Sequence, residues 1–158
     1  MNIQKHPLNT RRKPKALPFY VIAGSFIVVA LINSLRGGTP KEQDQKWFKK
    51  GMDLYENQEY AKAAEWFRKA AEQGHAVAQF NLGFMYANGK GVPKNRSKAV
   101  EWVHKAAEQG HEDAQFNLGS MYAEGKGVVQ DDAKAVEWLR KAAQQGNKKA
   151  QEILKELE

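Results

Sequence analysis

Two kinds of apolar stripe at helical spacing alternate along the chain between residues 44 and 146. In the middle of this region the first stripe consists of Ala78, Leu82, Met85 and Tyr86, and the second of Ala99, Trp102, Val103, Ala106 and Ala107. The segment "NGKGVP" lies between them and breaks the helix, Asn95 is the expected N-cap of the second helix, and Gly110 ends it. The pattern therefore predicts two amphipathic helices joined by a turn.

This helix pair recurs. Trp66, Trp102 and Trp138 are 36 residues apart, and "KAAEQG" at 69 and 105 returns as "KAAQQG" at 141. The stretch "GHAVAQFNLGFMYANGKGV" is followed, one period later, by the closely similar "GHEDAQFNLGSMYAEGKGV". A fixed period of this length is typical of stacked helical hairpins. We expect Gly83 and Gly119, at the same place in successive units, to let neighbouring helices approach closely.

The first unit and the end of the chain differ from this pattern. The first unit lacks the "GKGV" loop, and "YENQEYAKAAEWF" joins its helices directly. The last residues, "NKKAQEILKELE", are expected to form one amphipathic capping helix with a polar outer face. We therefore predict units at 44–73, 74–109 and 110–146, and a C-terminal cap at 147–158.

The N-terminal part contains an uncharged run, "ALPFYVIAGSFIVVALINSL", at 16–35. As a helix it would span roughly 30 Å, the hydrocarbon thickness of a bilayer. We predict a transmembrane signal anchor here, between a basic arm at 1–15 and a polar linker at 36–43. A cleaved signal peptide is the competing interpretation, although "ALINSLRGG" offers only Ser34 as a poor cleavage site. A buried helix of a soluble domain is disfavoured because the run has no polar face.

The net charge of +7 is concentrated near the N-terminus, where residues 1–36 contribute +6 and the rest of the chain only +1. A nucleic-acid-binding domain would be expected to carry its own basic face, so the charge does not favour nucleic acid as a partner. Basic residues close to the apolar run place the N-terminal arm in the cytoplasm. The repeats are then expected outside the inner (plasma) membrane, in the periplasm or outside the cell. Cleavage near Ser34 would instead give a secreted protein.

No motif predicts catalysis, a cofactor or a metal. "NGKGV" lacks the G-x4-G-K-[ST] pattern of a phosphate-binding loop, and the chain has no cysteine. His75, His104 and His111 form no ligand set with carboxylates, so we expect them at turns and on the surface. Asp131 or Asp132 is expected to cap a helix. We accordingly predict neither enzymatic activity nor a small-molecule substrate.

The segments "AQFNLGFMYANGKGV…KAVEWVHKAAEQG" and "AQFNLGSMYAEGKGV…DDAKAVEWLRKAAQQG" resemble Sel-one-like repeats, which are relatives of the tetratricopeptide repeat. The resemblance covers about residues 44–146, and the first unit is closer to an ordinary tetratricopeptide hairpin. It implies an all-α fold, a short right-handed α-solenoid of helix-turn-helix repeats, here preceded by the single N-terminal transmembrane helix. Members of the family generally act as protein-binding scaffolds, and many are bacterial and exported or membrane-tethered.

Positions that change between units are freer to carry partner contacts than positions that stay constant. In related solenoids the first helices line the concave side, and the face opposite the Ala78 stripe is the one they would present. This candidate groove consists of Phe48, Met52, Val77, Phe80, Asn81, Phe84, Asn88, Phe116, Asn117, Ser120 and Glu124. Phe80 and Phe116 recur, and their alternative role is packing between neighbouring units; Phe84 is replaced by Ser120 and is less easily explained by packing. The three recurring tryptophans are expected to anchor the core.

These features predict a membrane-tethered scaffold or adaptor that binds a partner protein or peptide through the concave face of its repeats. The alternative is a regulatory subunit of a membrane complex that acts through its transmembrane helix, in which Gly24 and Ser25 form a small patch.

Overall fold

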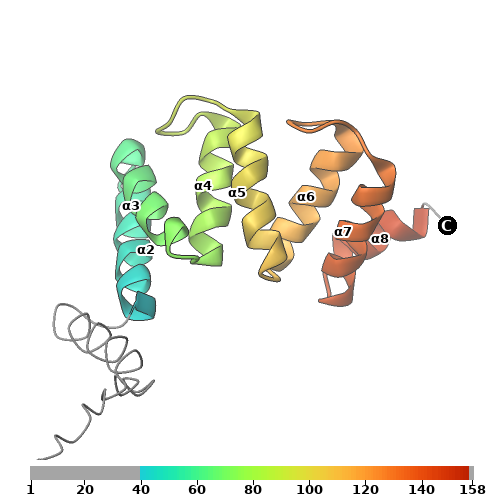
Figure 1. The fold of residues 1–158 in the computed structure, drawn as a ribbon, viewed down its shortest axis with the longest axis horizontal. Helices are drawn as coiled ribbons and strands as arrows, with labels where there is room; N and C mark the ends of the chain where they lie inside the picture. Colours follow the sequence, from blue (N-terminus) through green and yellow to red (C-terminus); the bar gives the residue numbers. More distant parts are fainter. Residues whose placement is uncertain (1–39, 157–158) are drawn as a thin grey trace, which may run out of the picture. The chain divides into compact units, whose positions relative to one another are not determined.

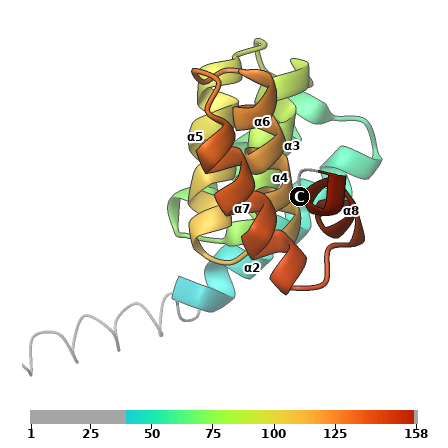
Figure 2. The same ribbon diagram turned by 90° about the vertical axis from the view of Figure 1, so that its right-hand side faces the viewer.

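The computed structural model describes residues 40–156 (Figure 1). They form the helices α2 (Pro40–Glu56), α3 (Tyr60–Glu72), α4 (Ala76–Asn88), α5 (Arg96–Glu108), α6 (Glu112–Glu124), α7 (Asp132–Gln144) and α8 (Lys148–Glu156). Each helix packs against the next one in the chain, and Figure 2 shows α8 beside α7 at the end of the series. The described part is thus an all-helical solenoid, as the repeat pattern predicted. Its expected right-handedness stays a prediction.

The predicted basic arm and transmembrane helix lie outside the described residues. Within residues 40–156, no helix combines the length and the apolar character needed to cross a membrane. The predicted linker at 36–43 differs from the structure at its end, since α2 already begins at Pro40. Proline is favourable in the first turn of a helix, where its missing N–H would have no intrahelical partner.

Capping side chains fix where most helices begin. Asn95 and Asp131 cap α5 and α7, and their side-chain oxygens accept hydrogen bonds from the backbone N–H groups of Lys98 and Lys134. Both caps were expected from the sequence, and the structure selects Asp131 over Asp132. Asn147 caps α8 in the same way. These polar residues satisfy backbone donors that a helix leaves free in its first turn.

The core between the helices is built mainly of small residues. Ala78, Ala99, Ala106 and Ala114 are fully buried, with Phe67, Leu82, Met85 and Leu118 as the largest side chains among them. A Cβ atom at Gly83 would lie 2.7 Å from Val103 Cγ2, and one at Gly119 would lie 2.8 Å from Leu139 Cγ. The close helix approach expected at these two glycines is therefore confirmed.

The two glycine loops also connect successive units. A Cβ atom at Gly91 would lie 2.3 Å from the backbone carbon of Tyr60, at the start of α3, and one at Gly127 would lie 2.7 Å from the carbonyl oxygen of Arg96, at the start of α5. Both glycines have positive φ angles, of 72° and 81°. Each loop thus lies against the second helix of the preceding unit.

Buried glutamines add a second connection between units. The Gln79 and Gln115 side chains donate hydrogen bonds to the carbonyl oxygens of Ala71 and Ala107, over 3.0 and 3.1 Å. Their own side-chain oxygens accept from Gln109 and Gln145, over 2.7 and 2.8 Å. Because a buried amide without partners is costly, this repeated pattern holds adjacent units in one register.

Candidate functional site

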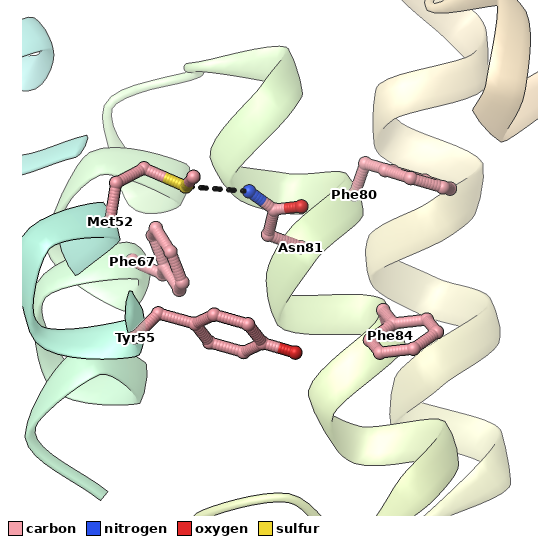
Figure 3. A pocket seen from close by; sticks show the side chains of 6 residues that line it. All are labelled: Met52, Tyr55, Phe67, Phe80, Asn81 and Phe84. Carbon is pink, nitrogen blue, oxygen red and sulfur yellow. Dashed lines mark hydrogen bonds between the residues drawn. The ribbon is translucent and has the colours of Figure 1, made fainter. Parts of the chain in front are cut away.

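An apolar pocket lies between the first two units (Figure 3). Its volume is about 270 Å³, and it is lined by Met52 and Tyr55 of α2, Phe67 of α3, and Phe80, Asn81 and Phe84 of α4. The Asn81 amide donates a hydrogen bond to Met52 Sδ over 3.7 Å, the dashed line in Figure 3. Met52, Phe80, Asn81 and Phe84 belong to the candidate groove, so the structure brings these four predicted residues together.

Two apolar residues on α4 are unusually exposed. Phe84 leaves 49% of its surface accessible and Val77 leaves 39%. Phe67, by contrast, leaves only 1% of its surface accessible and belongs to the core beneath the pocket. The exposed ring of Phe84 and the apolar lining of the adjacent pocket form one contiguous apolar surface, which is why this region is the candidate site.

The other phenylalanines of the candidate groove pack between units. Phe48 stacks on His75 with ring centroids 4.5 Å apart, and Phe80 stacks on His111 with centroids 4.9 Å apart. Phe116 packs against the cluster of Leu139, Ala142 and Ala150. All three are half-buried, which agrees with the alternative role considered for Phe80 and Phe116. Whether any of them also contacts a partner stays a prediction.

The polar groove residues bond mostly within their own helices. The Asn88 amide donates to the carbonyl oxygen of Phe84 over 2.8 Å, and the Asn117 amide to that of Asp113 over 2.7 Å. The Ser120 hydroxyl donates to the carbonyl oxygen of Phe116 over 3.1 Å, and Glu124 pairs with Lys126. Asn81 is the one polar groove residue that lines the apolar pocket, whereas Asn88, Asn117, Ser120 and Glu124 do not.

His75 and His111 have a role that the sequence analysis missed. Each caps a helix, because its Nδ1 accepts a hydrogen bond from the backbone N–H of Ala78 or Ala114, over 3.1 and 3.2 Å. Burial lowers the pKa of His111, against a weaker opposite effect of Asp113 and Glu112. The sequence did contain a signal for this role. Both histidines directly precede the first helix of a unit, and the capping residue Asn147 has the same position before α8.

His104, expected on the surface, is half-buried and meets the Trp138 ring edge-on at 5.5 Å. Trp102 and Trp138 pack against the core, as predicted. Trp66 is half-buried between Lys50 and Lys69, each 4.2 Å from its ring centroid.

In the described part of the chain, no three His, Asp or Glu side chains cluster closely enough to hold a metal ion.

The family model of the Sel1 repeat matches residues 46–75, 76–111 and 112–147. Among curated proteins, an exopolysaccharide production negative regulator of Rhizobium leguminosarum bv. viciae is 36% identical over 84 residues, covering 48% of this chain and 32% of that protein. The chain thus spans about a third of this relative.

Three solved structures are similar. A Sel1 repeat protein from Oxalobacter formigenes is 47% identical with a TM-score of 0.60, over 62% of this chain and 29% of that one. A protective antigen of uropathogenic Escherichia coli with an SLR fold is 39% identical with a TM-score of 0.67, over 77% and 26%. Helicobacter pylori cysteine rich protein B is 29% identical with a TM-score of 0.58, over 74% and 98%. With three matching repeats over more than half of its length, the chain belongs to the Sel1 repeat family.

Proposed function

We propose that this chain is an adaptor that binds a segment of a partner protein in the candidate groove. Sel1 repeat proteins generally mediate protein–protein interactions and are typically non-enzymatic scaffolds. The observation that carries the proposal for this chain is the half-exposed ring of Phe84 at the apolar pocket.

The size of the pocket favours a side chain over a whole small molecule. Its volume of about 270 Å³ is below the range of roughly 300–1,000 Å³ that is usual for ligand sites. A single large apolar side chain projecting from a peptide or helix would bury Phe84 and fill the space. Buried anchors of this kind supply most of the binding energy in protein interfaces.

The proposal includes a membrane tether formed by residues 16–35, with the N-terminus in the cytoplasm. A tether would confine the groove to the membrane surface and raise its effective concentration toward membrane partners. The curated relative is named a negative regulator, which favours a regulatory role as the outcome of binding.

A second candidate is regulation through the transmembrane helix itself. Replacing residues 16–35 with an unrelated anchor should preserve function if the groove acts, and abolish it if the helix acts.

A photo-crosslinking experiment tests the groove. A photoreactive residue is placed at position 84 of the full-length chain in its native cells, with position 69 on α3 as the control. Lys69 lies over the ring of Trp66, also on α3, whereas Phe84 is on α4. Lys69 lines no part of the apolar pocket. A discrete protein captured from 84 and absent from 69 supports the proposal. Equal capture at both positions, or none at either, contradicts it and favours the transmembrane helix.

A further inference from the structure

Equivalent segments of the second and third units carry net charges of opposite sign. Residues 73–100 contain four basic side chains (Lys90, Lys94, Arg96 and Lys98) and no acidic one. The equivalent residues 109–136 contain five acidic side chains and two basic ones. The fold is the same in both units, so the repeat architecture does not require this difference.

Part of the basic charge converges on a second pocket of about 210 Å³, the basic pocket, at the junction of the second and third units. Its lining residues are Ala87, Asn88, Lys94, Arg96, Ala99, Met121 and Lys126. Lys126 pairs with Glu124. Within residues 40–156, Lys94 and Arg96 have no acidic partner, so they give the pocket its excess positive charge.

The junction between the first and second units shows how a loop lysine can be accommodated within the chain. There Lys90, the equivalent of Lys126, donates a hydrogen bond to the Tyr55 hydroxyl over 2.9 Å. It also lies over the rings of Tyr55 and Tyr60, 4.5 and 4.2 Å from their centroids. The equivalent of Tyr60 at the next junction is Arg96. An aromatic partner for the loop lysine is thus replaced by another cation, which raises the local positive potential.

The basic pocket lies close to the apolar pocket along α4. Phe84 lines the apolar pocket and Asn88 lines the basic one. Residues four apart are neighbours on one helix face, separated by a rise of about 6 Å. The hydrogen bond from the Asn88 amide to the carbonyl oxygen of Phe84 belongs to the same turn. One short segment of a partner can therefore reach both pockets.

We propose that the partner segment is an acidic peptide that places a large apolar side chain in the apolar pocket and an Asp or Glu carboxylate at Lys94 and Arg96. This inference rests on the proposed function, because it names the chemistry of the segment that the groove would take. Its specific content is the carboxylate, since charge complementarity at the edge of an interface selects partners and speeds association.

The test is a selection of random peptides of about twelve residues, a length that spans a groove of this kind, on the immobilised full-length chain. Lys94→Gln/Arg96→Asp copies Gln130 and Asp132 of the third unit, so the fold already accommodates these residues. Lys148→Gln/Lys149→Asp makes the same change of charge in α8 and is the matched control. Phe84→Ser copies Ser120 and removes the apolar contact. Each selected peptide is also made with its Asp and Glu replaced by Asn and Gln.

We expect selected peptides to combine a large apolar residue with Asp or Glu. Lys94→Gln/Arg96→Asp should weaken their binding about five- to tenfold, more at low salt, and the control variant should not. The neutralised peptides should bind this variant and the unchanged chain equally. Peptides that depend on Phe84 but show no acidic preference overturn this inference and leave the proposed function standing. If binding of no peptide depends on Phe84, both are overturned.

Discussion

The turn of the first unit contains a residue in an unfavourable backbone conformation. Gln58 has a φ of 63°, and among the described residues it is the only one other than glycine with a positive φ. Left-handed backbone costs about 1–2 kcal/mol for a residue with a Cβ, against about 0.5–1 kcal/mol of extra chain entropy lost when glycine folds. We expect Gln58→Gly to raise the free energy of unfolding by about 0.5–1 kcal/mol, measured by urea denaturation.

The control for that prediction is Gln73→Gly. Gln73 ends α3 with a φ of −85°, which a side chain adopts freely. Glycine there adds chain entropy to the unfolded state without relieving strain, so this variant should lose stability. A gain in both variants would contradict the explanation by backbone strain.

His111 makes stability depend on pH. Its Nδ1 accepts a hydrogen bond only when unprotonated, and burial lowers its pKa below the ordinary value of 6.5. The unfolded chain therefore takes up this proton more readily than the folded one. The contribution is complete above about pH 6.5 and is lost as the pH falls through the lower pKa of the folded state.

His111→Asn should reduce this dependence, because Asn147 shows that an amide makes the same cap. Urea denaturation at about pH 7.5 and about pH 5 measures it, with the other histidines present in both proteins. We expect the unchanged chain to lose more stability on acidification than the variant. Equal losses would show that His111 does not contribute.

For single residues, sequence reasoning succeeded where a side chain bonds to the backbone of a residue nearby in the chain. The caps at Asn95 and Asp131 depend on neighbours three residues away, and a local pattern contains them. The stacking of Phe80 on His111 and the bond between Gln79 and Gln109 join residues about thirty apart. The recurrence of these residues was visible, but their partners depend on how one unit rests on the next.

At the scale of helices and loops, the glycine loops should contribute to stability through contact with the preceding unit. Gly91→Ala introduces a Cβ at 2.3 Å from the Tyr60 backbone, in addition to the strain of a positive φ. Gly74→Ala has the same kind of strain at a φ of 92°, with no atom within 4 Å of the new Cβ. Urea denaturation of both variants separates the two effects.

We expect Gly74→Ala to cost about 1–2 kcal/mol and Gly91→Ala to cost about 1–3 kcal/mol more, because backbone atoms must move apart. Similar losses in the two variants would mean that the loop does not depend on this contact. The sequence predicted a turn at "NGKGV", since glycine there suits a turn wherever the loop lies. It contained no indication that the loop rests on α3, a contact that only the stacked units define.

At the scale of the whole repeat array, stability is passed from neighbour to neighbour, since each helix contacts those next to it in the chain. In such arrays the terminal element protects the last apolar face. Ile153 and Leu154 of α8 pack against the cluster that contains Leu139 and Ala142. We expect Ile153→Ser/Leu154→Ser to lower the free energy of unfolding by about 2–4 kcal/mol, measured by urea denaturation.

The matched control is Glu152→Ser/Lys155→Ser, which changes the two flanking exposed residues of the same helix. This variant should stay within about 0.5 kcal/mol of the unchanged chain. Equal effects of the two double substitutions would mean that helix propensity, and not packing of α8, determines stability at this end.

The period of 36 residues was sufficient to predict an all-helical solenoid, because every unit must present the same apolar stripes to its neighbours. It predicted less of the candidate site. Four predicted residues meet at the apolar pocket: Met52, Phe80, Asn81 and Phe84. Tyr55 and Phe67 of the first unit also line it and were not predicted. The shorter loop of the first unit makes its residues harder to align with those of the other two units. The basic pocket was missed because Lys94 and Lys126 belong to different units and approach only when these are stacked.

The C-terminal helix begins as though it were the first helix of another unit. Asn147 caps it, and the Gln151 side chain donates to the carbonyl oxygen of Ala143, over 3.0 Å, as Gln115 does to that of Ala107. One period after Gly119, however, stands Lys155. A helix docking on α8 as α7 docks on α6 would meet this side chain where Leu139 now meets a glycine. The side chain of Lys155 thus disfavours stacking of a further unit on α8, and the design of a longer array would have to include Lys155→Gly.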